Sequence, residues 1–75
     1  MTGLTPNQRN LLYLLAIGAH AEKTGSDAET AMDQLDTYTD RSIANDGGDV
    51  MLMVGRQILV RAPRAWIIAM DQGTL

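Results

Sequence analysis

Four carboxylates near the middle of the chain have a spacing that would bring them to one side of an α-helix. They are separated by four, three and four residues, and they are Glu29, Asp33, Asp36 and Asp40. At about 100° per residue, the set spans an arc of only about 60°. Like charges at these distances repel one another. We interpret this acidic stripe as a binding surface for a basic partner. A solvated helix face is the simplest alternative, and pairing with arginines of the same chain is another.

Other residue types that perform chemistry are scarce. The chain has no cysteine and a single histidine, His20, and it lacks a Ser/His/Asp set and a glycine-rich phosphate loop. Carboxylates on a helix, without histidine or a ligand-rich loop, make a poor site for a divalent cation. We therefore expect no enzymatic activity, no metal and no cofactor.

Positive charge is concentrated in the last third of the chain. Residues 26–49 carry a net charge of −6 and residues 50–75 a net charge of +2, in a chain of −3 overall. The arginines of the last third are Arg56, Arg61 and Arg64. Guanidinium groups bind both carboxylates and phosphates, so these arginines are candidate contacts for an anion or a partner.

The element with the clearest boundaries is a helix over residues 6-24. Thr5 and Gln8 have the spacing of a capping box, and Pro6 falls at the first helical position. Gly25 can end the helix in the left-handed conformation. Apolar residues spread around most of its circumference, so we expect a central helix with other elements packed on several sides.

The acidic stripe requires a second helix, predicted over residues 27-46. Ser26 and Glu29 repeat the capping-box spacing, and apolar residues recur with the helical period. The sequence Asn-Asp-Gly-Gly at residues 45–48 predicts the stop and a turn.

The remaining residues fit two further helices, over 50-62 and 63-72, separated by Pro63. Two short strands, Val50–Val54 and Gln57–Arg61, are the alternative for the first of these segments. We favour the helix because the link between the strands lacks a strong hairpin signal. The predicted fold is thus an all-α bundle of three to four helices, in one domain spanning residues 1-75.

Self-association is expected from the small size of this domain. A core of this length supplies only about 3–5 kcal/mol, and no disulfide can add to it because cysteine is absent. The candidate self-association residues are Val50, Met53, Val54, Trp66, Ile67 and Met70. Since the N-terminus does not have the pattern of a secretory signal and no apolar run reaches membrane-spanning length, we expect a cytoplasmic protein without a membrane span.

The segment Leu4-Thr-Pro-Asn-Gln-Arg-Asn-Leu-Leu-Tyr-Leu-Leu-Ala16 resembles the opening helix of some winged-helix and other helix-turn-helix DNA-binding domains. Those families often begin with Leu-Thr-Pro and a leucine pair. The resemblance covers little more than a dozen residues. It implies that a recognition helix with basic and amide side chains should follow, but the segment that follows here is acidic.

Two functions therefore remain. The favoured one is a small non-enzymatic protein-interaction module (an adaptor, an inhibitor or an assembly component) that acts through an apolar helix face edged by the acidic stripe. The alternative is a helix-turn-helix-like nucleic-acid-binding protein that uses the C-terminal arginines. The acidity of the whole chain disfavours the alternative, because phosphate contacts supply much of the affinity for nucleic acid.

Overall fold

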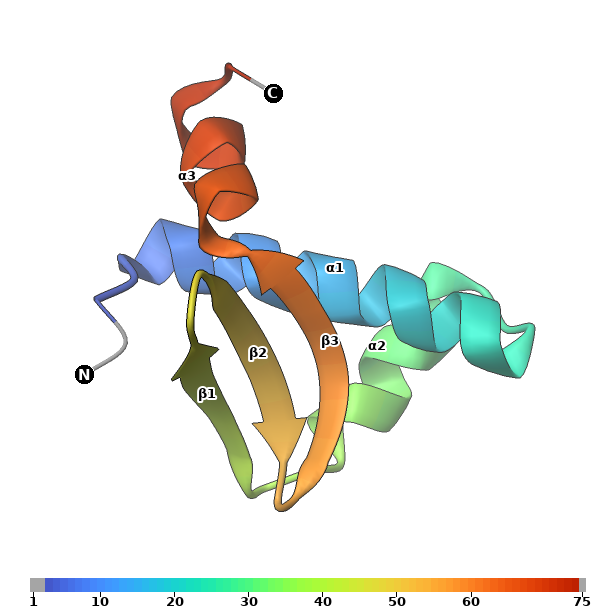
Figure 1. Cartoon of the computed structure of the whole chain (residues 1–75). Helices are drawn as coiled ribbons and strands as arrows, with labels where there is room; N and C mark the ends of the chain where they lie inside the picture. Colours follow the sequence, from blue (N-terminus) through green and yellow to red (C-terminus); the bar gives the residue numbers. More distant parts are fainter. Residues whose placement is uncertain (1–2, 75) are drawn as a thin grey trace.

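Three helices and a three-stranded antiparallel sheet make up the fold, and the computed structural model describes residues 3–74. In chain order the elements are α1 (Pro6–Thr24), α2 (Ala28–Asp36), β1 (Arg41–Asp46), β2 (Asp49–Val54), β3 (Gln57–Pro63) and α3 (Arg64–Gln72) (Figure 1). The protein is therefore α+β, and the predicted all-α bundle is wrong.

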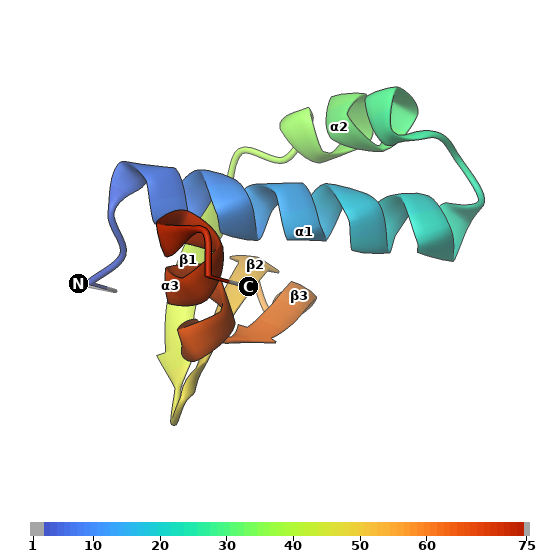
Figure 2. The same cartoon turned by 90° about the horizontal axis from the view of Figure 1, so that it is seen from above.

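Helix α1 begins and ends where the local sequence signals predict. Thr5 Oγ1 accepts a hydrogen bond from the Gln8 amide at 3.2 Å, and the Gln8 side chain accepts one from the Thr5 amide at 3.0 Å. Gly25 ends the helix with φ 69°. The sheet lies on one side of α1 and α2 on the other, with α3 beside its first half (Figure 2). The prediction of a central helix is confirmed.

Helix α2 ends at Asp36, whereas the sequence predicted a helix that continues to residue 46. That prediction is wrong. Its N-cap is Asp27, which accepts a hydrogen bond from the Thr30 amide at 2.8 Å; this bond lowers the pKa of Asp27 below its ordinary value. The residues after Asp36 are Thr-Tyr-Thr, and aromatic and β-branched residues favour extended structure over helix. The helical period seen in the sequence therefore runs on by coincidence into strand β1.

Residues 50-62, for which a helix was favoured, form strands β2 and β3, so that prediction is wrong and the hairpin alternative is right. Each pair of strands is joined by a two-residue turn, Gly47-Gly48 and Gly55-Arg56. Gly47 has φ 60° and Gly55 has φ 58°. A glycine with positive φ at the first turn position is the requirement of a type II′ hairpin. One glycine at that position was a sufficient turn signal.

The sheet presents one apolar face to α1. Ile43, Leu52 and Val60 are cross-strand neighbours on that face. The register between β2 and β3 shifts at Leu52/Met53, which leaves Leu59 as an extra residue in β3. No helix lies over the opposite face of the sheet in the described part of the chain (Figures 1 and 2).

Helix α3 completes the core against the first half of α1. Ile67 is fully buried there. Near the end of α3, the Asp71 carboxylate accepts hydrogen bonds from Asn7 and, at 3.1 Å, from Gln8 Nε2. The first turn of α1 has no acidic residue of its own. Asp71 therefore supplies the negative charge that the N-terminal end of α1 favours.

Candidate binding groove

A groove of about 650 Å³ lies between the first half of α1 and strand β1. Its lining residues are Arg9, Asn10, Tyr13, Asp36, Arg41, Ser42, Ile43 and Leu52. The volume is within the range of about 300–1,000 Å³ that is usual for ligand sites. Among the strands, α1 packs mainly against β3 and β2, and the groove lies next to this contact, at β1.

Tyr13, Asp36 and Arg41 form a connected set at one end of this groove. The Tyr13 hydroxyl donates a hydrogen bond to Asp36 Oδ1. The Arg41 guanidinium carbon lies 5.2 Å from the centre of the Tyr13 ring, and Arg41 Nη1 lies 3.4 Å from Asp36 Oδ1. The contacts combine a cation–π interaction with an ion pair, and they tie α1, the end of α2 and β1 together.

The same contacts decide the protonation of Tyr13. Burial raises the pKa of Tyr13 above its ordinary value of 10.0, and the hydrogen bond and charge of Asp36 raise it further, whereas Arg41 opposes the shift in part. Tyr13 is therefore a protonated hydrogen-bond donor at neutral pH and a poor general base or nucleophile.

Arg9 is the second cation of the groove. It lies on α1 one helical turn before Tyr13 and is exposed. Within residues 3–74 its guanidinium makes no hydrogen bond or ion pair. The groove thus holds one arginine that is engaged by the fold and one that is available to a ligand.

The acidic stripe is shorter than predicted, because α2 contains three of its four residues and Asp40 lies beyond the helix. Asp36 is the last residue of α2 and its carboxylate lies in the groove. Asp40 follows the helix, and its carboxylate lies beside Gly55 in the β2–β3 turn. Glu29 and Asp33 are exposed on α2 and lie outside the groove lining. The structure brings none of the three C-terminal arginines to this helix; the basic partner of Asp36 is Arg41.

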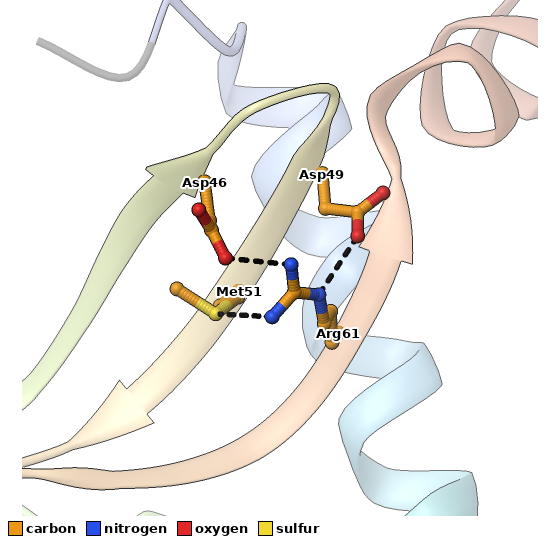
Figure 3. A network of polar contacts seen from close by, with 4 residues as sticks. All are labelled: Asp46, Asp49, Met51 and Arg61. Atoms are coloured by element: carbon orange, nitrogen blue, oxygen red, sulfur yellow. Dashed lines mark hydrogen bonds and ion pairs between the residues drawn. The ribbon is translucent and has the colours of Figure 1, made fainter.

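Arg61 belongs instead to a polar network on the outer face of the sheet. Its Nη2 lies 2.6 Å from Asp46 Oδ2, and its Nε donates to Asp49 Oδ2 at 2.7 Å (Figure 3). Asp46 and Asp49 are directly opposite each other in the β1–β2 ladder. Arg61 therefore relieves the repulsion of two like charges that face each other across strands. Its guanidinium also reaches the sulfur of Met51 at 3.9 Å.

The three predicted arginines do not form a common surface. The Arg64 Nη1 group donates to Asn45 Oδ1 at 3.1 Å, near the β1–β2 turn. Arg56 lies in the β2–β3 turn, at the other end of the sheet. Arg61 is paired with two aspartates. The three arginines therefore have separate local environments.

The predicted self-association residues are divided by the fold. Val50 and Ile67 are fully buried in the core and are not available to a partner. Met53, Val54 and Met70 are half-buried, whereas 55% of the Trp66 surface is exposed. Trp66 and Met70 are four residues apart on α3 and thus share one side of the helix.

Sequence reasoning did not identify Arg9, Tyr13 and Arg41 as partners in a site. The only local signal is the four-residue spacing of Arg9 and Tyr13 in α1, which places them on one face. Across residues 3–74, no group of three or more His, Asp and Glu side chains has the arrangement of a metal site. The helices described are also too short or too polar to cross a membrane.

Comparison with known proteins gives one informative similarity. No protein-family model matches the chain, and no curated protein matches it. The structure is similar to the crystal structure of a bacterial toxin from Mycobacterium tuberculosis, with a TM-score of 0.78 and 26% sequence identity. The similarity covers 87% of this chain and 92% of the toxin chain, so it extends over nearly the whole fold.

Proposed function

We propose that this protein is a toxin-like inhibitor that slows bacterial growth by binding a protein target. The observation that carries the proposal is the fold that it shares with a bacterial toxin over 87% of its length. A shared fold alone does not define a function. Here the likeness includes 26% sequence identity and nearly all of both chains, and a small inhibitory module also agrees with the length of 75 residues.

Binding without catalysis is favoured by the chemistry of the groove. Tyr13 is kept protonated, and Asp36 is held by both Tyr13 and Arg41. A general base needs a pKa near the working pH and a lone pair that faces the substrate. We therefore propose that these side chains shape a contact surface, and that a protein partner, with no cofactor, is what the surface meets.

Nucleic-acid binding is the less favoured function. Two of the three C-terminal arginines are engaged by Asp46, Asp49 and Asn45, and counterion release requires cations that are free to meet phosphates. A cytoplasmic location is part of the proposal, and fractionation of host cells that express the chain tests it.

The test is induced expression of the wild-type chain in a bacterial host, with growth followed by optical density and viable counts. We expect growth arrest that increases with the amount of protein, because a stoichiometric inhibitor must match the number of its target molecules. The target is then identified by affinity capture and mass spectrometry, and its overexpression should restore growth.

The matched control is the Leu35→Asp variant, which places a charge at a fully buried core position and should not fold. Normal growth with soluble, folded wild-type protein contradicts the proposed function. Arrest at a few molecules per cell, which added target cannot relieve, would indicate catalysis and contradict the binding mechanism.

A further inference from the structure

Strand β1 offers an unpaired edge. It pairs with β2 on one side, and within residues 3–74 no strand pairs with its other side. Alternate N–H and C=O groups of such an edge point outward and can pair with another polypeptide. Proteins often block an edge strand with proline or with charged side chains, especially lysine. Strand β1 contains no proline or lysine, and its charged residues, Arg41 and Asp46, stand at its two ends and leave residues 42–45 uncharged.

The groove runs along this edge on the side that faces α1. Alternation along β1 places Arg41 and Ile43 on that side, with Leu52 of β2 next to Ile43. Arg9 and Tyr13 face them from α1. A strand added to β1 would therefore place every second side chain into a groove that has an apolar floor and two guanidinium groups.

The charge of the groove favours an acidic occupant. Two arginines and one aspartate line it, giving +1 in a chain whose net charge is −3. The one carboxylate, Asp36, is already matched by Tyr13 and Arg41. Arg9 is left to meet a carboxylate of the ligand, with a charge-assisted hydrogen bond as the expected contact.

We propose that this groove and the free edge of β1 bind an extended acidic segment of a partner protein, which joins the sheet as a fourth strand. The inference deepens the proposed function and rests on it for the biological consequence. A polypeptide is favoured over nucleic acid because only a polypeptide backbone can continue the ladder of hydrogen bonds, while pockets beside the edge select its side chains.

The probe is a blocked heptapeptide of sequence Thr-Glu-Thr-Val-Thr-Glu-Thr, whose alternation can place both glutamates and the valine on one side of a strand. Binding to the isotopically labelled full chain is followed by two-dimensional NMR. We expect saturable shifts at the amides of Arg41–Asp46 and of Arg9–Tyr13, and slower hydrogen exchange of the β1 amides.

Two variants with the same change of charge separate the groove from the rest of the surface. Arg9→Gln should weaken binding about tenfold, as the loss of one charge-assisted hydrogen bond. Arg56→Gln, in the β2–β3 turn and outside the groove lining, should leave the affinity unchanged. Two N-methylated peptides are compared, one methylated at its odd-numbered residues and one at its even-numbered residues. Only one of them should lose binding, because only every second peptide amide would donate to β1.

Three results would overturn the inference. They are equal effects of Arg9→Gln and Arg56→Gln, shifts confined to the outer face of the sheet, and tighter binding of a single-stranded RNA than of the peptide. Growth arrest by a wild-type chain that does not bind the peptide overturns this inference and leaves the proposed function intact. Peptide binding without growth arrest supports this inference and contradicts the proposed function.

Discussion

The hydroxyl of Tyr13 donates its hydrogen bond to the carboxylate of Asp36, a residue 23 positions later in the chain. Asp36 ends α2, where the helix dipole disfavours a negative charge, and the last turn of α2 has no basic residue. The hydrogen bond from α1 and the guanidinium of Arg41 from β1 supply the compensation. This pair therefore stabilises a helix end that its own sequence leaves unfavourable.

The first prediction concerns the stability of this pair at high pH. The folded-state pKa of Tyr13 is raised, so its contribution is fully present below the unfolded pKa of about 10 and is lost as the pH rises through the folded pKa. Tyr13→Phe should lower the free energy of unfolding by about 1 kcal/mol near neutral pH. The difference from wild type should shrink at alkaline pH, as measured by urea unfolding at about pH 8 and about pH 11.

Tyr38→Phe is the matched control, since Tyr38 makes no side-chain hydrogen bond within the described residues. It should change the free energy of unfolding little near neutral pH, because it removes no side-chain hydrogen bond within the described residues. A Tyr13→Phe variant whose deficit grows with rising pH would contradict the direction of the pKa shift.

The second prediction separates two aspartates of α2. Asp36→Lys places a cation beside Arg41 and removes the acceptor of Tyr13, so it should lower the free energy of unfolding by about 1–2 kcal/mol. Asp33→Lys makes the same charge change at an exposed position and should have little effect. Thermal unfolding measured by circular dichroism compares the two, and equal melting temperatures would exclude a structural role for Asp36.

The third prediction concerns the network of Arg61. Arg61→Gln leaves Asp46 and Asp49 facing each other without a cation, so the melting temperature should fall. The double variant Arg61→Gln/Asp46→Asn should recover part of the loss, because it removes one of the two facing charges. The interaction is read from a double-mutant cycle that includes Asp46→Asn alone; additive effects of the two changes would show that the residues are not coupled.

The fourth prediction is self-association through the exposed side of α3. Trp66 and Met70 share that side of the helix, and Trp66 is 55% exposed. We expect wild-type protein to sediment as a homodimer at micromolar concentration, because so short a chain gains stability by burying such surface. Trp66→Ser should shift the equilibrium toward monomer, whereas Leu14→Ser, at a 60% exposed position of α1, should not. Sedimentation of wild type as a monomer at every concentration contradicts this prediction.

Helix α1 could be predicted from sequence because its determinants are local. The capping box of Thr5 and Gln8 and the glycine at residue 25 act within a few residues of the helix ends, and such signals do not depend on the rest of the fold. The final helix was predicted for the same reason, since Pro63 precedes it and Gly73 ends it with φ 72°.

The sheet was missed because its signals are ambiguous at short range. The run from Val50 to Val54 is apolar without alternation, which fits a strand or a buried helix equally well. In the structure β2 is the central strand, so cross-strand neighbours shield even the residues that face away from α1, and Met51 is only 8% exposed. The alternation that identifies a strand is absent for that reason.

The groove was beyond sequence reasoning because three separate elements build it. Arg9, Asp36 and Arg41 come from α1, α2 and β1, and their approach depends on α2 ending before the strand begins. A helix continued to residue 46 would have kept Asp36 and Arg41 on different sides of it. One wrong helix boundary was therefore enough to conceal the site.

The bond between Asp71 and Gln8 has a consequence for the order of events during protein synthesis. The two residues are 63 positions apart, so the first turn of α1 is synthesised well before the carboxylate that complements it. The ribosome adds about 5–20 residues per second, and α1 waits several seconds for its partner. The fold therefore closes only after α3 has been synthesised and docks on α1.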